Sequence, residues 1–181
     1  MVRTGVVGCG YLGRHHARIL AGIPGSHPVG FVEMDDARAK EIEEAHGAGG
    51  MVRRGSIREL LDRGATAVVV ATPTSTHAEV AAELLEGGAD VMIEKPITTT
   101  LAEADALVAL ARAKGRVLQV GHIERFNPAV AAVRPLVTDV KFIEAHRLGV
   151  FVPRALDVDV VLDLLVHDLD IALDLVGRPV R

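Results

Sequence analysis

The chain has 181 residues, enough for one domain with a substantial core or for one domain and part of a second. Hydrophobic residues make up 49% and aromatic residues 3%, and the net charge is −4 without a basic stripe, which excludes a typical nucleic-acid-binding protein. Cys9 is the one cysteine, which excludes internal disulfides and multi-thiolate metal sites. The sequence has neither an apolar run long enough to span a bilayer nor a secretory signal, so we expect no membrane partner and a cytoplasmic location.

Short apolar runs alternate with longer helical patterns over residues 1–121. The apolar runs predict strands at 2–7, 29–33, 67–71, 90–94 and 117–120. Helices are predicted between them, at 12–21, 36–46, 56–63, 76–87 and 101–114. Strands that alternate with helices through short loops form βαβ units, so the sequence predicts the α/β class and a Rossmann-type, doubly wound parallel sheet.

The pattern changes after Gly121. It predicts a short helix at 127–137, a longer strand at 141–150 and an apolar helix at 158–176 that stops at Gly177. One strand and one apolar helix have no sheet on which to pack. We therefore expect residues 1–121 to form a complete domain and residues 122–181 to be the truncated start of an α+β domain, whose exposed apolar helix leaves a homo-oligomer open.

Gly8, Gly10 and Gly13 form a Gly-x-Gly-x-x-Gly pattern between the first predicted strand and the first predicted helix. In a dinucleotide-binding loop the first glycine permits a tight turn, the second lets the backbone approach a pyrophosphate, and the third permits close helix–strand packing. The helix N-terminus then offers unpaired N–H groups to the phosphates. The alternative is a glycine-rich turn in some other α/β protein.

Glu33 stands 20 residues after Gly13, at the end of the second predicted strand. Its carboxylate could accept both ribose hydroxyls of an adenosine and would repel a 2′-phosphate. The residues that directly follow Glu33 are Met34, Asp35 and Asp36, so no arginine or lysine is adjacent to hold such a phosphate. The sequence therefore predicts a dinucleotide site that favours NAD over NADP.

Three further groups of residues are interpreted as structural. His15 and His16 are expected on the surface or in the packing of the first helix, and Cys9 is expected to fill space in the loop. Asp168 and Asp170 cannot share one helix face, so no metal site is predicted.

Four later stretches carry further polar and charged residues: 71–77 (ATPTSTH), 94–96 (EKP), 121–128 (GHIERFNP) and 163–170 (DLLVHDLD). Together with the glycine loop they resemble the Gfo/Idh/MocA family of sugar and polyol oxidoreductases over the whole chain. The third stretch is most similar to the branch that acts on nucleotide sugars, the UDP-N-acetylglucosamine 3-dehydrogenase-like branch.

The resemblance implies an NAD-dependent dehydrogenase that transfers a hydride between nicotinamide and a hydroxyl-bearing carbon of a sugar, nucleotide sugar or polyol. It makes Lys95 the residue beside the reacting hydroxyl and His167 the acid/base. Asp163, four residues before His167 and on the same helix face, would orient it or bind substrate hydroxyls. A cis Lys95–Pro96 peptide would fix the direction of the lysine. The structural alternatives are a surface lysine in a turn and a histidine that satisfies a buried polar spot.

The resemblance also assigns cofactor binding to Gly8, Gly10, Tyr11, Leu12, Gly13, Glu33, Thr72, Pro73, His77, Glu94 and Lys95. It assigns substrate binding to Lys95, Arg125, Asp163 and His167. Two of these residues have an alternative role: His77 as an ordinary residue at a helix N-terminus, and Arg125 as an anchor between the two domains.

Members of this family are usually much longer and continue after the last helix into a mixed sheet that forms the substrate domain, the oligomer interface or both. A second function therefore stays open for the truncated chain, namely a non-catalytic dinucleotide-binding or regulatory module of the same fold. Retention of Lys95, Asp163 and His167 favours the enzyme, whereas the missing sheet favours the module.

Overall fold

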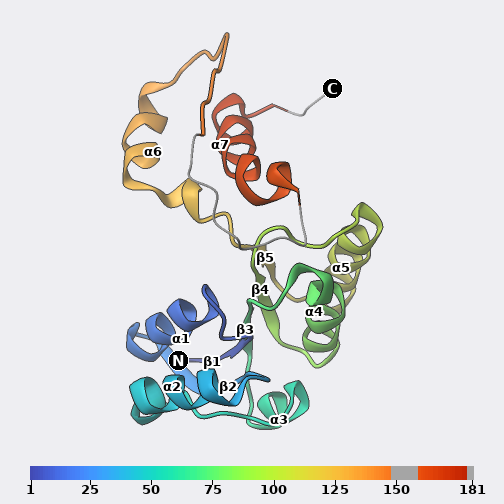
Figure 1. The fold of residues 1–181 in the computed structure, drawn as a ribbon. Coiled ribbons are helices and arrows are strands. Elements are labelled where there is room, and N and C mark those ends of the chain that lie inside the picture. The colour runs from blue at the N-terminus through green and yellow to red at the C-terminus, as the bar shows by residue number, and fades with distance from the viewer. Residues whose placement is uncertain (148–158, 179–181) are drawn as a thin grey trace. The chain divides into compact units, whose positions relative to one another are not determined.

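The computed structural model describes residues 1–147 and 159–178, which fall into two units, Met1–Val120 and Gly121–Arg181. The strands of the first unit are β1 (Val2–Val7), β2 (Ser26–Val32), β3 (Ala67–Val70), β4 (Asp90–Ile93) and β5 (Leu118–Val120). They form one parallel sheet in the order β2-β1-β3-β4-β5 (Figure 1). The predicted α/β class and doubly wound sheet are confirmed.

Five α-helices connect these strands: α1 (Gly13–Gly22), α2 (Asp36–His46), α3 (Ile57–Asp62), α4 (His77–Glu86) and α5 (Leu101–Lys114). Their starts follow local sequence signals. Asp35 accepts the backbone N–H of Arg38 at 3.0 Å before α2, and Thr100 and Glu103 form a capping box on α5. The observed bounds confirm the predicted strands and helices of this unit, with small differences at their ends.

Each face of the sheet packs against its own apolar cluster. Val6 of β1 belongs to a cluster that contains Ala17 of α1 and Ile42 of α2. Val7, the next residue of the same strand, belongs to a cluster with buried residues of α3, α4 and α5, among them Leu84. Because successive side chains of a strand point to opposite faces, this division puts helices on both faces of the sheet.

A short segment that the sequence analysis does not predict extends the sheet beyond β2. Phe31 of β2 pairs in parallel with Arg53. The Phe31 N–H donates to the Val52 carbonyl at 3.1 Å, and the Arg54 N–H donates to the Phe31 carbonyl at 2.7 Å. With this segment on the outer side of β2, the strand order reverses between β1 and β3. The carboxyl ends of β1 and β3 therefore border the crevice in which doubly wound sheets bind ligands.

The second unit contains α6 (Pro128–Val133), a π-helical turn (Val161–Leu165) and α7 (Val166–Val176). Asn127 caps α6 by accepting the Ala129 N–H at 3.0 Å, and Gly177 ends α7 with a φ of +60°. Both predicted helices of this unit are confirmed within the described residues. None of the helices in 1–147 and 159–178 has both the length and the apolar character needed to cross a membrane.

The strand predicted at 141–150 is wrong for its described part. Residues 141–147 form no strand, and residues 148–150 lie outside the described residues. A β-strand is stabilised by hydrogen bonds to a neighbouring strand, and the described part of the second unit contains no strand that could pair with it. Alternation of apolar and polar residues is therefore not enough here to form a strand.

Candidate functional site

The glycine-rich loop joins the end of β1 to the start of α1, beside the crevice. A Cβ on Gly13 would lie 1.8 Å from the Gly8 carbonyl oxygen, and Gly8 itself has a φ of +84°. At Gly10, by contrast, a Cβ would meet nothing within 4 Å. The fold therefore requires glycine at Gly8 and Gly13, whereas Gly10 borders open space that a ligand could approach. Tyr11 and Leu12, which follow Gly10, are both exposed.

Glu33 follows β2 and holds the loop from the other side. One carboxylate oxygen accepts the backbone N–H of Cys9 at 2.7 Å, and the other accepts the backbone N–H of Asp35 at 2.9 Å. The residue is only 8% exposed. Because each carboxylate oxygen can accept more than one hydrogen bond, Glu33 keeps capacity for the hydroxyl groups of a ribose.

Two arginines lie near Glu33, although none adjoins it in the sequence. The Arg38 guanidinium is 3.8 Å from the Glu33 carboxylate and 3.3 Å from that of Asp35. Arg53 donates to the Glu33 carbonyl at 2.8 Å and pairs with Asp36 at 2.6 Å. The residues that directly follow Glu33 contain no arginine or lysine, as the sequence shows, but the fold brings two arginines close to it in space. Arg38 lies on α2, and Arg53 reaches this place through the segment that extends the sheet.

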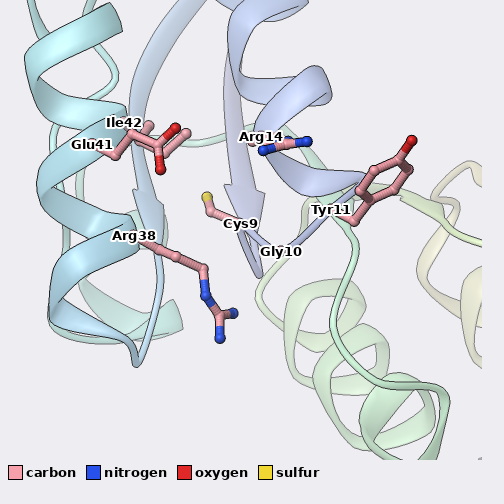
Figure 2. Close-up of a pocket in the computed structure, with 7 residues that line it drawn as sticks. All are labelled: Cys9, Gly10, Tyr11, Arg14, Arg38, Glu41 and Ile42. Carbon is pink, nitrogen blue, oxygen red and sulfur yellow. The ribbon is translucent and has the colours of Figure 1, made fainter. Parts of the chain in front are cut away.

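A pocket of about 390 Å³ adjoins the loop. Figure 2 shows the Arg38 side chain reaching from α2 toward the loop, with Arg14 and Tyr11 on the α1 side. The Arg14 guanidinium lies 5.2 Å from the centre of the Tyr11 ring. The pocket is lined by Cys9, Gly10, Tyr11, Arg14, Arg38, Glu41 and Ile42. Its two guanidinium groups make its walls suitable for the polar, anionic half of a nucleotide.

Cys9 lies within this loop and is 2% exposed. Burial and, to a smaller extent, the nearby Glu33 carboxylate together raise the pKa of its thiol to about 12, against a smaller opposite effect of Arg38. A neutral, buried thiol packs as a small apolar group, in agreement with the space-filling role expected from the sequence.

The loop after β3 carries Thr72, Pro73 and His77. The Thr76 hydroxyl donates to the Thr72 hydroxyl at 2.9 Å and to the Pro73 carbonyl at 2.8 Å. His77, the first residue of α4, is 1% exposed, and its ring nitrogens lie 2.9 Å from the Pro96 carbonyl and 3.0 Å from the Thr72 carbonyl. Both ring nitrogens therefore face backbone oxygens, which leaves neither of them for a direct bond to a cofactor.

The 94–96 stretch follows β4 at the same edge of the sheet. The Lys95–Pro96 peptide is cis. One Glu94 carboxylate oxygen lies 2.7 Å from Nε2 of His16, and the other accepts the backbone N–H of Lys95 at 3.2 Å. His16, which the sequence suggests is only a surface or packing residue, thus connects α1 to the segment that carries Lys95.

In the second unit, the acids around His167 form ion pairs. Arg125 donates to both carboxylate oxygens of Asp170, one of them at 3.0 Å, and lies 3.5 Å from Asp174. Arg147 binds both oxygens of Asp168 at 2.8 Å, and this hydrogen bonding holds the pKa of the Asp168 carboxyl below its ordinary value. These pairs show that Arg125 binds the last helix. Among the described residues, no group of histidines, cysteines and acids is arranged to hold a metal.

Asp163 and His167 lie on successive parts of the last helical segment. Asp163 belongs to the π-helical turn, and His167 is the second residue of α7. The prediction that both side chains share one face assumes regular α-helical spacing, which the π-turn interrupts. Lys95 belongs to the first unit, so the joint role of the three residues remains a prediction.

A family model described as "Oxidoreductase family, NAD-binding Rossmann fold" (GFO_IDH_MocA) matches residues 2–122. The chain is 41% identical over 177 residues to the UDP-N-acetylglucosamine 3-dehydrogenase of Acidithiobacillus ferrooxidans, a match that covers 97% of this chain and 55% of that protein. One solved structure of that enzyme matches this chain with a TM-score of 0.89 and 41% identity, over 99% of this chain and 58% of the other.

A more distant relative is the scyllo-inositol 2-dehydrogenase (NAD(+)) of Bacillus subtilis. It is 29% identical over an alignment of 203 residues, which covers 99% of this chain and 55% of that protein. The chain therefore spans about half the length of these curated relatives.

Proposed function

Because this chain belongs to the Gfo/Idh/MocA family of oxidoreductases with an NAD-binding Rossmann fold, we propose that it is an NAD-dependent dehydrogenase acting on a hydroxyl-bearing carbon of a sugar, nucleotide sugar or polyol. The observation that carries the proposal is the built loop, in which Glu33 holds the Cys9 N–H at 2.7 Å while Gly10 borders open space. These residues fit a dinucleotide. The same proposal makes residues 122–181 the start of a substrate domain.

NAD is the proposed cofactor because the Glu33 carboxylate is fixed in place. Two backbone N–H groups hold its oxygens, so the side chain does not turn away from the ribose position without losing both bonds. Ribose hydroxyls can donate to its remaining lone pairs, whereas a 2′-phosphate would bring a second negative charge beside it. Arg38, at 3.8 Å, offsets part of that repulsion and limits the preference.

The proposed chemistry gives separate roles to Lys95 and His167. The nicotinamide, when bound, supplies the acceptor or donor of the hydride. A carbinol carbon that loses hydride must also lose its hydroxyl proton, and the charge developing on its oxygen needs a donor. We propose that the imidazole of His167 accepts the hydroxyl proton. The Lys95 ammonium donates a hydrogen bond to the oxygen on which the charge develops. Asp163 would orient His167 or bind neighbouring hydroxyls of the substrate.

A nucleotide sugar is the substrate class that we propose first. The support is the 41% identity to a UDP-N-acetylglucosamine 3-dehydrogenase over 97% of the chain, against 29% to the inositol enzyme. The 121–128 stretch gave the same preference from sequence. Inositols remain the second class to test.

The experiment measures NAD-dependent turnover of a panel of UDP-sugars and inositols by the 181-residue chain. Lys95→Met is compared with Lys114→Met, which changes an exposed lysine at the end of α5. Wild type and Lys114→Met are expected to oxidise a UDP-sugar, and Lys95→Met should be at least about 100-fold slower because it lacks the donor at the reacting oxygen.

Equal turnover by the two lysine variants would remove Lys95 from the chemistry. NADH binding without turnover of any panel member would support the non-catalytic dinucleotide-binding module. Absence of both NADH and NADPH binding would contradict both functions.

A further inference from the structure

Two histidines from two different helices reach the short segment that carries Lys95. We propose that His16 of α1 and His77 of α4 are positioning residues. They hold residues 94–96, and with them the backbone of Lys95, in place relative to the glycine-rich loop. The inference rests on the proposed function for the role of Lys95. It goes beyond that function because it gives each histidine a role that acts through Lys95.

His16 acts on the segment through Glu94. Its Nε2 lies 2.7 Å from one oxygen of the Glu94 carboxylate, and these side chains are only 19% and 12% exposed. The other oxygen of the same carboxylate accepts the Lys95 N–H at 3.2 Å. The Glu94 N–H also donates to the Val70 carbonyl of β3 at 2.9 Å. The carboxylate therefore joins helix α1 to the backbone of Lys95, in a site where solvent screens the contact only weakly.

His77 holds the opposite end of the segment. Its Nδ1 lies 2.9 Å from the Pro96 carbonyl and its Nε2 3.0 Å from the Thr72 carbonyl, and the residue is 1% exposed. Both partners are acceptors, so a neutral ring donates to one of them and a protonated ring to both. The ring therefore lies between the loop after β3 and the turn that follows Lys95, with one nitrogen against a carbonyl of each.

The two histidines connect Lys95 to the parts of the protein that would hold the dinucleotide. Helix α1, which carries His16, begins at the last glycine of the loop. Thr72, which His77 contacts, belongs to the loop at the end of β3, beside the crevice. A lysine that must contact a reacting hydroxyl next to a bound cofactor needs a fixed position, because a small displacement of a catalytic group lowers the reaction rate strongly.

The first test compares His16→Ala with His15→Ala. His15 is the neighbouring residue of the same helix, and its ring lies 5.8 Å from that of Tyr11 rather than on Glu94. The exchange rate of the Lys95 backbone N–H is followed by NMR on the full chain, together with NADH affinity, KM and kcat. Relative to His15→Ala, His16→Ala should raise this exchange rate at least about tenfold. The reason is that the Glu94 carboxylate, which accepts the Lys95 N–H, loses its contact with the His16 ring.

The kinetic constants distinguish positioning from general stabilisation. His16→Ala should lower kcat about 10- to 100-fold while KM and NADH affinity stay within about threefold, because binding survives when a catalytic group is displaced. Equal Lys95 exchange in the two variants would overturn the inference, whether or not the chain turns over a substrate. Absence of activity in wild type counts against the proposed function alone, since exchange does not depend on turnover.

If His16→Ala also lowers the melting temperature, His16→Gln resolves the cause, since its amide can still donate to Glu94. Recovery of both Lys95 protection and kcat in His16→Gln supports the inference. Recovery of the melting temperature without recovery of Lys95 protection overturns it.

The second test separates the two contacts of His77. His77→Asn keeps a donor near the Nδ1 position, which faces Pro96, whereas His77→Gln keeps one near the Nε2 position, which faces Thr72. Because the Pro96 contact adjoins Lys95, kcat of His77→Asn should exceed that of His77→Gln by at least about threefold at similar melting temperatures. Equal kcat and equal Lys95 exchange in these two variants would overturn the part assigned to His77.

Discussion

Glu33 accepts the backbone N–H of Cys9 at 2.7 Å, and this bond joins the end of β2 to the glycine-rich loop after β1. The acid expected to bind ribose hydroxyls is thus also a structural part of the loop that approaches the pyrophosphate. Both roles depend on one nearly buried carboxylate. Changes to Glu33 should therefore alter both cofactor affinity and loop order.

Glu33→Gln should lower NADH affinity about 10- to 100-fold, because hydrogen bonds to a charged group contribute about 1.5–3 kcal/mol. The amide has one acceptor oxygen, so it cannot hold the N–H groups of both Cys9 and Asp35 as the carboxylate does. NADH fluorescence titration measures the change. Glu44→Gln, an exposed acid on the same helix α2 as Arg38, is the control. Equal affinities in the two variants would show that Glu33 does not contact the cofactor.

Arg38→Met should weaken NADPH binding more than NADH binding, by at least about fivefold in the ratio of the two affinities. The Arg38 guanidinium lies 3.8 Å from the Glu33 carboxylate, and its side chain is 52% exposed in the pocket wall. Its loss removes a positive charge that offsets part of the repulsion between Glu33 and a 2′-phosphate. Arg58→Met, which breaks an exposed pair with Asp62, is the control. An unchanged ratio in Arg38→Met would mean that this arginine does not face the ribose.

Gly13→Ala should lower the stability of the fold, whereas Gly10→Ala should lower the affinity for NADH. The Gly13 Cβ would overlap the Gly8 carbonyl oxygen, so this variant should lose at least about 1–3 kcal/mol of unfolding free energy. Gly10 has open space around it, so Gly10→Ala should keep its stability within about 0.5 kcal/mol but lose NADH affinity at least about tenfold.

Gly22→Ala at the end of α1 is the matched control for both glycine variants, because its Cβ also meets nothing within 4 Å. Urea denaturation and NADH titration of the three variants provide the comparison. If Gly10→Ala binds NADH as tightly as Gly22→Ala, the pyrophosphate does not lie against Gly10.

The pKa of the Cys9 thiol predicts a loss of stability at high pH. In the fold the pKa is about 12, above the ordinary value of 9.0. An unfolded chain therefore releases the thiol proton above pH 9 while the folded chain retains it, so the contribution is constant below pH 9 and declines as pH rises toward 12. The slope is at most about 1.4 kcal/mol per pH unit. Urea denaturation from pH 8 to 11 should show this slope in wild type and its absence in Cys9→Ala. Parallel pH profiles would contradict the buried, neutral thiol.

The elements of the first unit were predictable because their signals are local. The capping box of Thr100 and Glu103 and the glycines of the loop involve residues within a few positions of one another. Glu33 was predictable because its spacing from the loop reflects one βαβ unit. These features are encoded in short stretches and do not depend on the order of the strands.

The contacts that the sequence missed join residues far apart in the chain. His16 and Glu94 are separated by 78 positions and meet only because β1 and β4 flank β3 in the sheet. Arg53 reaches the Glu33 carbonyl through the added segment beside β2. The described part of the strand predicted at 141–150, residues 141–147, forms no strand for a similar reason, since pairing depends on a partner strand that a local pattern cannot supply.

Direct titration with nucleotide tests whether the first unit binds NAD through its glycine-rich loop and Glu33. The fluorescence of NADH itself reports binding, and the chain contributes no tryptophan emission. The 181-residue chain should give a saturable signal with NADH, and NADPH should bind at least about tenfold more weakly. No saturable signal with either nucleotide, or tighter binding of NADPH than of NADH, would contradict the account.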